Sequence, residues 1–172
     1  KDMHILRQHR QATPLSKQAI CLPKFLNDII KIMQPRAAIS NTVIELNNHH
    51  NVMEIYSNPI LLQNILINLL HNACIYSLSR PVMLKVITMD NSIELQVHDH
   101  GLGMSKHKIS KLFNVQAPPK GIKNKKLHLQ GLGIGLFIVK KFCTIIDAEI
   151  RVESIKDKGS TFTITIKNAP KG

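Results

Sequence analysis

Three clusters of glycine lie in the second half of the 172-residue chain. They contain six of its eight glycines: Gly101 and Gly103, then Gly131, Gly133 and Gly135, and then Gly159. Glycine lets the backbone adopt positive φ or approach a ligand closely. The second cluster opens directly onto a predicted helix, whose free N–H groups and positive dipole end attract phosphate. For one such cluster alone, a tight turn with a helix cap would be the favoured interpretation, and the remaining elements of a dinucleotide-binding fingerprint are missing.

Three asparagines, Asn64, Asn68 and Asn72, are spaced four residues apart, so on a helix they share one face. Asparagine is a poor residue for the middle of a helix. Its side-chain carbonyl oxygen can ligate Mg²⁺, a hard cation that takes oxygen ligands. The alternative interpretation is a solvated polar stripe opposite an apolar one that contains Leu62 and Leu66.

Asp99 ends a segment in which Ile93, Leu95 and Val97 alternate with other residues. In a strand, this period places the carboxylate on the same buried side as the three apolar residues. A buried carboxylate requires a hydrogen-bond donor. An amino group of a ligand is one candidate donor, and a backbone N–H of the following turn is the other.

Composition excludes several classes of protein. The chain is 44% apolar, which excludes a disordered chain, and it has no apolar run long enough to span a membrane. It starts at a lysine without a signal peptide, so we expect a soluble fragment of a longer protein. Three cysteines without a CxxC pair predict reduced, buried thiols, and nine scattered histidines without metal-site spacing are expected on the surface.

The net charge of +12 is concentrated in one segment. Nine lysines and no acidic residue lie between residues 100 and 146, whereas the rest of the chain is nearly balanced. Only 4% of the residues are aromatic, and no zinc-finger or RNA-binding spacing is present, so no nucleic-acid partner is expected. A basic stretch among glycines fits a polyphosphate ligand better.

The hydrophobic pattern predicts the elements that must position these residues. Helical periodicity over 22–33 ends at Pro35, and Asn58 caps a second helix that runs to about residue 76. Strands are predicted at 42–46, 52–56, 82–89, 93–99, 149–154 and 161–167, and further helices at 105–113 and 135–146. Since the strands come as hairpins between helices, we expect one α+β domain with a mixed sheet covered by helices on one face.

In order and spacing, these motifs resemble the ATP-binding domain of sensor histidine kinases, in the superfamily of gyrase, mismatch-repair and chaperone ATPases. Asn68-Leu-Leu-His-Asn72-Ala73 resembles the N box, and Lys111-Leu-Phe113 looks like a remnant of the F box. The segments that resemble the three glycine boxes of the family are Asp99-x-Gly101-x-Gly103, Gly131-x-Gly133-x-Gly135-Leu136 and Gly159-Ser-Thr-Phe162. The resemblance covers about residues 22–167 and implies a Bergerat-type fold, a two-layer α/β sandwich with a mostly antiparallel sheet.

The resemblance also implies a role for each motif residue, with ATP and Mg²⁺ as the ligands. Asn72 would ligate Mg²⁺, Asn68 would be a second polar contact near the metal and the phosphates, and these two would be the catalytic residues. Asp99 would accept the adenine amino group. Tyr76 would stack on the nucleotide or contact the ribose, or else close the helix as a rim aromatic. The other implied nucleotide contacts are Gly101, Gly103, Lys126, Gly131, Gly133, Gly135, Leu136 and Thr161.

Two departures from the family pattern bear on activity. Family members commonly carry a basic residue three positions after the metal asparagine, where this chain has Ile75. Residues 114–130 would form the ATP lid, and lysines of this lid could replace the missing contact or could simply keep a solvated loop open. These lysines are Lys120, Lys123, Lys125 and Lys126. The acid that usually follows Phe113 is also missing, which is expected to alter closure of the lid.

The resemblance further distinguishes phosphate transfer from hydrolysis. In the related ATPases a glutamate at the position of Asn68 activates water, but no acid occurs here between Glu54 and Asp90. We therefore expect the domain to hold ATP for an outside nucleophile. In the family this is a histidine on a separate dimerising domain, which relays the phosphoryl group to a response regulator. His9 lacks the acid and the arginine of a phosphoacceptor box.

The implied domain organisation is the end of a dimerisation helix and a linker at 1–20, the ATP-binding domain at 21–169 and a tail at 170–172. The parent protein is expected to be a homodimer that is cytoplasmic, either entirely or as the cytoplasmic part of a membrane-anchored protein. Three alternatives stay open: a nucleotide-binding regulatory module without phosphotransfer, an ATPase of the same superfamily, and a basic nucleic-acid-binding domain.

Overall fold

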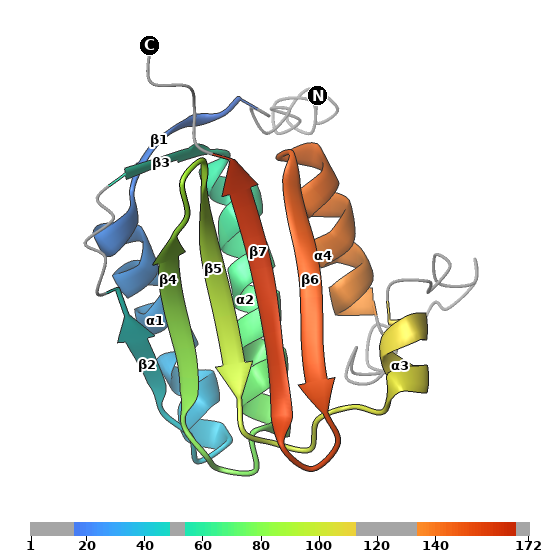
Figure 1. Ribbon diagram of the computed structural model, residues 1–172. Coiled ribbons are helices and arrows are strands. Elements are labelled where there is room, and N and C mark those ends of the chain that lie inside the picture. The colour runs from blue at the N-terminus through green and yellow to red at the C-terminus, as the bar shows by residue number, and fades with distance from the viewer. Residues whose placement is uncertain (1–15, 49–53, 113–133, 168–172) are drawn as a thin grey trace, which may run out of the picture.

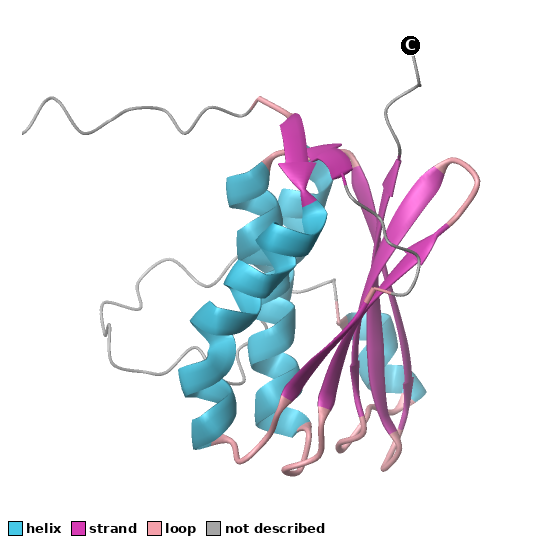
Figure 2. Cartoon of the chain, turned by 90° about the vertical axis from the view of Figure 1, so that its left-hand side faces the viewer, coloured by secondary structure: helices cyan, strands magenta, loops and turns pink. Residues whose placement is uncertain are grey.

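The computed structural model describes residues 16–48, 54–112 and 134–167. Figure 1 shows a sheet in front of a layer of helices, and Figure 2 shows that the long helices lie on one face of the sheet. Among the described residues, no helix is both long enough and apolar enough to cross a membrane. The elements are β1 (Gln18–Cys21), α1 (Leu22–Ile39), β2 (Ile44–Asn47), β3 (Glu54–Ser57), α2 (Pro59–Tyr76), β4 (Val82–Thr88), β5 (Ser92–Asp99), α3 (Lys106–Lys111), α4 (Ile134–Ile145), β6 (Ala148–Ile155) and β7 (Gly159–Lys167).

Five strands form the main sheet, in the order β2-β4-β5-β7-β6. β2 runs parallel to β4, and the other neighbouring pairs are antiparallel. Together with α1, α2 and α4 on one face, this confirms the expected α+β fold with a mixed, mostly antiparallel sheet. The hairpins β4–β5 and β6–β7 lie where the strand pattern predicts them.

The core lies between the helices and the inner face of the sheet. The leucines of α2 at positions 62, 66, 69 and 70 are fully buried, at 0% exposure. Ile93, Leu95 and Val97 of β5, which packs against α2, are at most 4% exposed. Burying one such side chain stabilises the fold by roughly 1.5–3 kcal/mol. This packing therefore holds the helix that bears the asparagines against the strand that ends in Asp99.

The helix α2 begins where the sequence predicts. Asn58 is its N-cap, and the side-chain oxygen of Asn58 accepts a hydrogen bond from the Leu61 N–H at 2.9 Å. Pro59 occupies the first turn, where its missing N–H has no cost. The helix ends at Tyr76, whose carbonyl oxygen accepts a hydrogen bond from the Leu102 N–H in the turn after β5.

The prediction that Pro35 ends the first helix is wrong, because α1 continues to Ile39. Proline inside a helix removes one hydrogen bond and costs about 3 kcal/mol. Here the buried residues Met33 and Ala37 lie on either side of Pro35 and extend the core-facing stripe of α1. The helix stops just afterwards, where Asn41 takes a φ of 48°.

Two strand pairings were not expected from the sequence. β1 lies where only a linker is predicted, and it pairs with β3 so that Ile20 faces Ile55. The predicted strands at 42–46 and 52–56 correspond to β2 and β3, which pair with β4 and β1 and not with each other. Both pairings join segments distant in sequence, which no local pattern reveals.

The cysteines match the expectation in part. All three thiols are free, and Cys74 and Cys143 are buried, but Cys21 is exposed at the start of α1. Burial raises the pKa of Cys74 to about 11 and that of Cys143 to about 12. Both buried thiols therefore stay protonated and behave as small apolar side chains.

Candidate nucleotide-binding site

Asp99 is the last residue of β5 and faces the helices, as the alternation predicts. It is 4% exposed, and Ile93, Leu95 and Val97 lie on the same side of the strand. Its Oδ1 accepts a hydrogen bond from the Gly101 N–H at 2.8 Å. The turn therefore supplies one donor, as one of the two interpretations expects. A carboxylate accepts more than one hydrogen bond, so capacity for a ligand amine remains.

Burial raises the pKa of the Asp99 carboxyl above its ordinary value. Backbone hydrogen bonds from Gly101 and Ser160 and the neighbouring His98 and His100 oppose this effect, in part, by favouring the ionised form. The raised pKa reflects a carboxylate that is only partly compensated by the protein. An additional donor from a ligand would complete its hydrogen bonding.

The first glycine cluster packs on the last turn of α2. A Cβ added at Gly101 would lie 1.6 Å from the carbonyl oxygen of Tyr76, so no other residue fits there. The Leu102 N–H donates to the same carbonyl at 3.2 Å. Tyr76 is thereby held at the rim of the site, where it is 39% exposed and the centre of its ring lies 5.9 Å from the Lys108 ammonium.

The third glycine cluster lies against Asp99 from the other side. Gly159 has a φ of 112°, and a Cβ there would lie 1.9 Å from the Asp99 carbonyl oxygen. In the register of β5 and β7, Asp99 is paired with Ser160. Ser160 is only 7% exposed. Its parity along β7 is that of the core residues Phe162 and Ile164, so its side chain lies on the same face as Asp99.

Thr161 is not brought to this site. It lies on the opposite face of the sheet, where its Oγ1 is 2.8 Å from His98 Nδ1. Ser160 is the residue near Asp99 that sequence reasoning missed. The signal was present in the alternation of β7, because residue 160 shares its parity with the apolar residues 162, 164 and 166.

The three asparagines follow one side of α2, and they differ in exposure. Asn64 is exposed, whereas Asn68 and Asn72 are half-buried. The amide nitrogens of Asn64 and Asn68 donate to the carbonyls of Ile60 and Asn64, each at 2.8 Å. These bonds use the amide nitrogens and do not involve the side-chain oxygens. Within the described ranges, the Asn72 side chain makes no hydrogen bond, so its oxygen is available to a ligand.

Asn68 connects α2 to the start of α4. A Cβ added at Gly135 would lie 3.2 Å from Asn68 Oδ1, so the two helices approach closely where the asparagine face begins. Leu136, in the first turn of α4, is buried at 9% exposure. The expected contacts Lys126, Gly131 and Gly133, the lid at 114–130 and Phe113 lie outside the described residues.

The described residues thus offer groups of complementary chemistry on α2, on α3 and at the end of β5. The buried carboxylate of Asp99 lies between two glycine turns, and the oxygens of Asn68 and Asn72 lie along α2. Exposed lysines of α3, including Lys108, add positive charge nearby. The 18 residues of α2 include no carboxylate. The arrangement can bind a ligand with an amino group at one end and negative charge at the other, but α2 holds no group that activates water.

A family model described as histidine kinase-, DNA gyrase B-, and HSP90-like ATPase matches residues 57–170. Among curated relatives, the autoinducer 2 sensor kinase/phosphatase LuxQ of Vibrio parahaemolyticus is 31% identical over 72% of this chain and 15% of its own length. The histidine protein kinase SaeS of Staphylococcus epidermidis is 28% identical over 87% of this chain and 43% of its own. The chain thus spans less than half the length of these relatives.

Solved structures share the fold at low sequence identity. The histidine kinase AdeS of Acinetobacter baumannii superposes with a TM-score of 0.71 at 19% identity, over 89% of this chain and 68% of that chain. The catalytic domain of histidine kinase ThkA gives a TM-score of 0.72 at 16% identity, over 91% and 98% of the two chains. The structure of full-length ShkA in complex with AMPPNP gives a TM-score of 0.75 at 20% identity, over 90% of this chain and 32% of that chain.

Proposed function

Because the chain belongs to the histidine kinase-, DNA gyrase B-, and HSP90-like ATPase family, we propose that it is the catalytic, ATP-binding domain of a sensor histidine kinase. The observation that carries this proposal is the buried, partly compensated carboxylate of Asp99 between two glycine turns. The relatives named as sensor or histidine kinases support the assignment to this branch of the family.

Asp99 accepts the exocyclic amino group of adenine. Backbone N–H groups of Gly101 and Ser160 engage the carboxylate, and its remaining accepting capacity is the part proposed for adenine. Ser160, on the same face of the adjoining strand, supplies a second short polar group beside it. Tyr76 borders this end of the site and packs against the base or the ribose.

The phosphates extend from this end along α2 toward α4. Asn68 and Asn72 present amide groups there, and the N-terminus of the 12-residue helix α4 attracts negative charge. The basic segment between residues 100 and 146 adds lysines that compensate for the missing basic residue at Ile75.

The residues also fit Mg²⁺ as the companion of ATP. Asn72 has a half-buried side-chain oxygen without a hydrogen bond to the described residues, and such an oxygen is a suitable ligand for this cation. When bound, the ion would neutralise charge on the phosphates. Asn68, one helical turn earlier, would orient the same region through its own oxygen.

The chain positions ATP for transfer and does not hydrolyse it. Hydrolysis requires a group that orients and activates water, and α2 contributes only amides. The nucleophile is a histidine of a separate dimerising domain in the longer, homodimeric protein, from which a response regulator takes the phosphoryl group. A regulatory module that binds ATP without transfer is the second candidate, and Ile75 in place of a basic residue is the observation that favours it.

Calorimetric titration of the chain with Mg-ATP, Mg-ADP and Mg-GTP tests the proposed site. ATP and ADP should bind, whereas GTP should bind at least about tenfold more weakly, because guanine presents a carbonyl oxygen to the Asp99 carboxylate. A hydrogen bond to a charged group contributes about 1.5–3 kcal/mol. Equal affinity for ATP and GTP would rule out this placement of the base.

A second assay separates the kinase from the regulatory module. The longer protein, which carries the phosphoacceptor domain, is incubated with γ-labelled ATP. Acid-labile label on a histidine supports the kinase. ATP binding without any label on the longer protein supports the regulatory module.

A further inference from the structure

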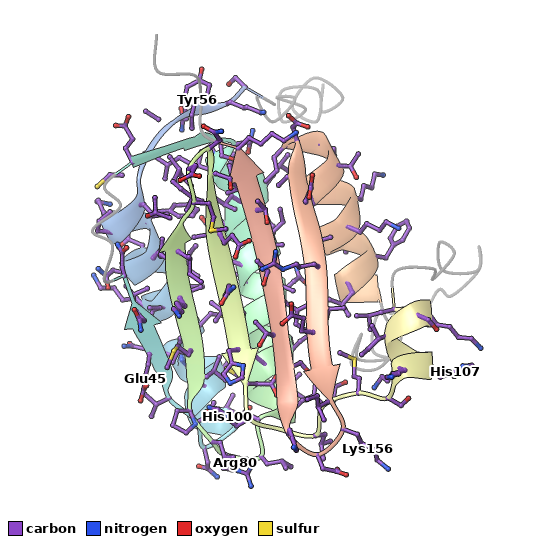
Figure 3. All side chains as sticks on the ribbon, viewed as in Figure 1. Glu45, Tyr56, Arg80, His100, His107 and Lys156 are labelled. Atoms are coloured by element: carbon purple, nitrogen blue, oxygen red, sulfur yellow. The ribbon has the colours of Figure 1, made fainter. Side chains whose placement is uncertain are left out.

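Two histidines meet on the face of the sheet that the helices leave open. His98 lies between the buried residues Val97 and Asp99 in β5. Because successive side chains of a strand point to opposite faces, its side chain lies on the outer face. His100 follows the end of the strand and is exposed. Figure 3 views this open face and labels His100 near the end of β5, well away from His107 on α3. Both histidines lie on the surface, as expected, but they contact each other and are not scattered.

The two imidazole rings approach each other through one nitrogen of each ring. His98 Nε2 and His100 Nδ1 are 3.3 Å apart, with ring centroids separated by 4.3 Å and ring planes at 89°. Two nitrogens that ligate one tetrahedral ion at the usual Zn–N length are roughly 3.3–3.4 Å apart. The pair thus already has the separation that a shared metal ion requires.

Neighbouring groups hold the pair in place. The second ring nitrogen of His98, Nδ1, lies 2.8 Å from Thr161 Oγ1. Metal-binding histidines are usually held in this way through the nitrogen that does not ligate the metal. The carbonyl of His100 accepts a hydrogen bond from Arg80 at 2.8 Å, which anchors its backbone. Burial and the neighbouring His100 lower the pKa of His98, which favours the neutral ring.

We propose that His98 and His100 together bind one divalent transition-metal ion, with Nε2 of His98 and Nδ1 of His100 as the protein ligands and water completing the coordination. Imidazole pairs suit Zn²⁺, Ni²⁺ and Cu²⁺, whereas Mg²⁺ prefers oxygen. The site is therefore chemically distinct from the one proposed at Asn72, and it does not rest on the proposed function.

Two protein ligands set the strength of this site. Within the described ranges, no three His, Cys, Asp or Glu side chains are arranged to hold a metal ion. The ion is consequently bound more weakly than in closed four-ligand structural sites. It connects the outer face of β5 to the first residue of the turn that carries Gly101, so binding stabilises the segment on either side of Asp99.

The test is a calorimetric titration of the untagged chain with NiCl₂ and with ZnCl₂. A titration with MgCl₂ is the negative control. Wild type is compared with His98→Gln, His100→Gln and the control His107→Gln, which alters an exposed histidine of α3. We expect one ion per chain in wild type and in the control. The affinity for the metal ion should fall at least about tenfold in His98→Gln and in His100→Gln. Mutation of residues that merely support the ligands of a metal site already lowers metal affinity about 10- to 100-fold.

Circular dichroism shows whether each variant is still folded. His100→Gln is the decisive variant, because His100 is exposed and its substitution is not expected to disturb the core. A folded His100→Gln protein that binds Ni²⁺ and Zn²⁺ like wild type would overturn the proposal and assign the ion to other histidines. Absence of binding of either ion to wild type would also overturn it.

Discussion

Asp99 combines a structural and a binding role in one side chain. Its Oδ1 holds the Gly101 N–H and so shapes the turn after β5, while burial keeps its pKa above the ordinary value. A neutral amide in its place could still accept from Gly101. The structural part of the role therefore survives substitution by asparagine, whereas the acceptor proposed for adenine changes.

We predict that Asp99→Asn lowers ATP affinity by about 10- to 100-fold, the value of one hydrogen bond to a charged acceptor. A carboxyl with a raised pKa in the folded state stabilises the fold below its unfolded pKa, and this contribution is lost as the pH rises through the folded pKa. Without nucleotide, the stability of the variant relative to wild type should therefore increase as the pH rises above about 4, the ordinary pKa of an aspartate. Melting curves across this range measure both effects; equal protection by ATP in both proteins would contradict the placement of adenine.

Asn72→Ala should weaken ATP binding in the presence of Mg²⁺ far more than in its absence, because the lost oxygen is the one proposed for the metal. Calorimetry with Mg²⁺ and with EDTA measures the difference. Asn64→Ala is the matched control, since Asn64 lies on the same stripe but is exposed. Equal losses with and without Mg²⁺ would indicate that Asn72 has a structural role.

At the scale of the elements, Ser154 of β6 joins two of the glycine segments. Its hydroxyl accepts from the Met104 N–H at 2.8 Å and donates to the Gly159 carbonyl at 2.9 Å. The Asp157 N–H, in the β6–β7 turn, donates to the Leu102 carbonyl at 2.7 Å. The Ser154 hydroxyl also lies 2.9 Å from that of Ser160. The edge of the sheet thereby holds the loop between β5 and α3 and contacts the residue that is paired with Asp99.

Ser154→Ala should destabilise the fold by about 1–3 kcal/mol, because it leaves the part-buried Met104 N–H without its partner. ATP affinity should also decrease, since the loop that carries Gly101 and Gly103 loses its support. Urea unfolding and calorimetry measure the two effects. Ser110→Ala, on the exposed side of α3, should change stability by less than about 0.5 kcal/mol. A Ser154→Ala protein as stable as this control would contradict the proposed support.

At the scale of the whole molecule, positive charge is concentrated in one segment of the chain, whereas the outer face of the sheet carries a compensated charge pair. Nine lysines without a compensating acid lie between residues 100 and 146, next to the site in the sequence. On the outer face, by contrast, Glu94 is 5% exposed and forms an ion pair with Arg151 at 3.0 Å. The positive segment raises the local concentration of a polyphosphate ligand and makes its binding sensitive to salt.

The chain by itself should bind ATP without labelling itself and without releasing phosphate. No carboxylate lies on α2 to activate water, and no histidine stands in a phosphoacceptor box. Incubation with γ-labelled ATP measures both outcomes. Acid-labile label on His9 would contradict the assignment of residues 1–20 to a linker, and rapid release of phosphate would place the chain among the ATPases of its family.

The sequence by itself determined what depends on neighbouring residues. The cap at Asn58, the period of α2 and the alternation that buries Asp99 are local, because each follows from side-chain spacing along one element. The order of the asparagine and glycine motifs was sufficient to identify the family. For the same reason Asp99 was predicted on the correct face before the sheet was known.

The tertiary structure decided what depends on contacts between distant segments. The pairing of β1 with β3, the parallel pairing of β2 with β4 and the passage of α1 through Pro35 all depend on packing partners far away in the sequence. The register of β5 and β7 pairs Asp99 with Ser160 and His98 with Thr161. Register is set jointly by two strands, and a shift of one residue would exchange the two faces. The local pattern therefore predicted the motifs, and only the assembled sheet determined which residues meet.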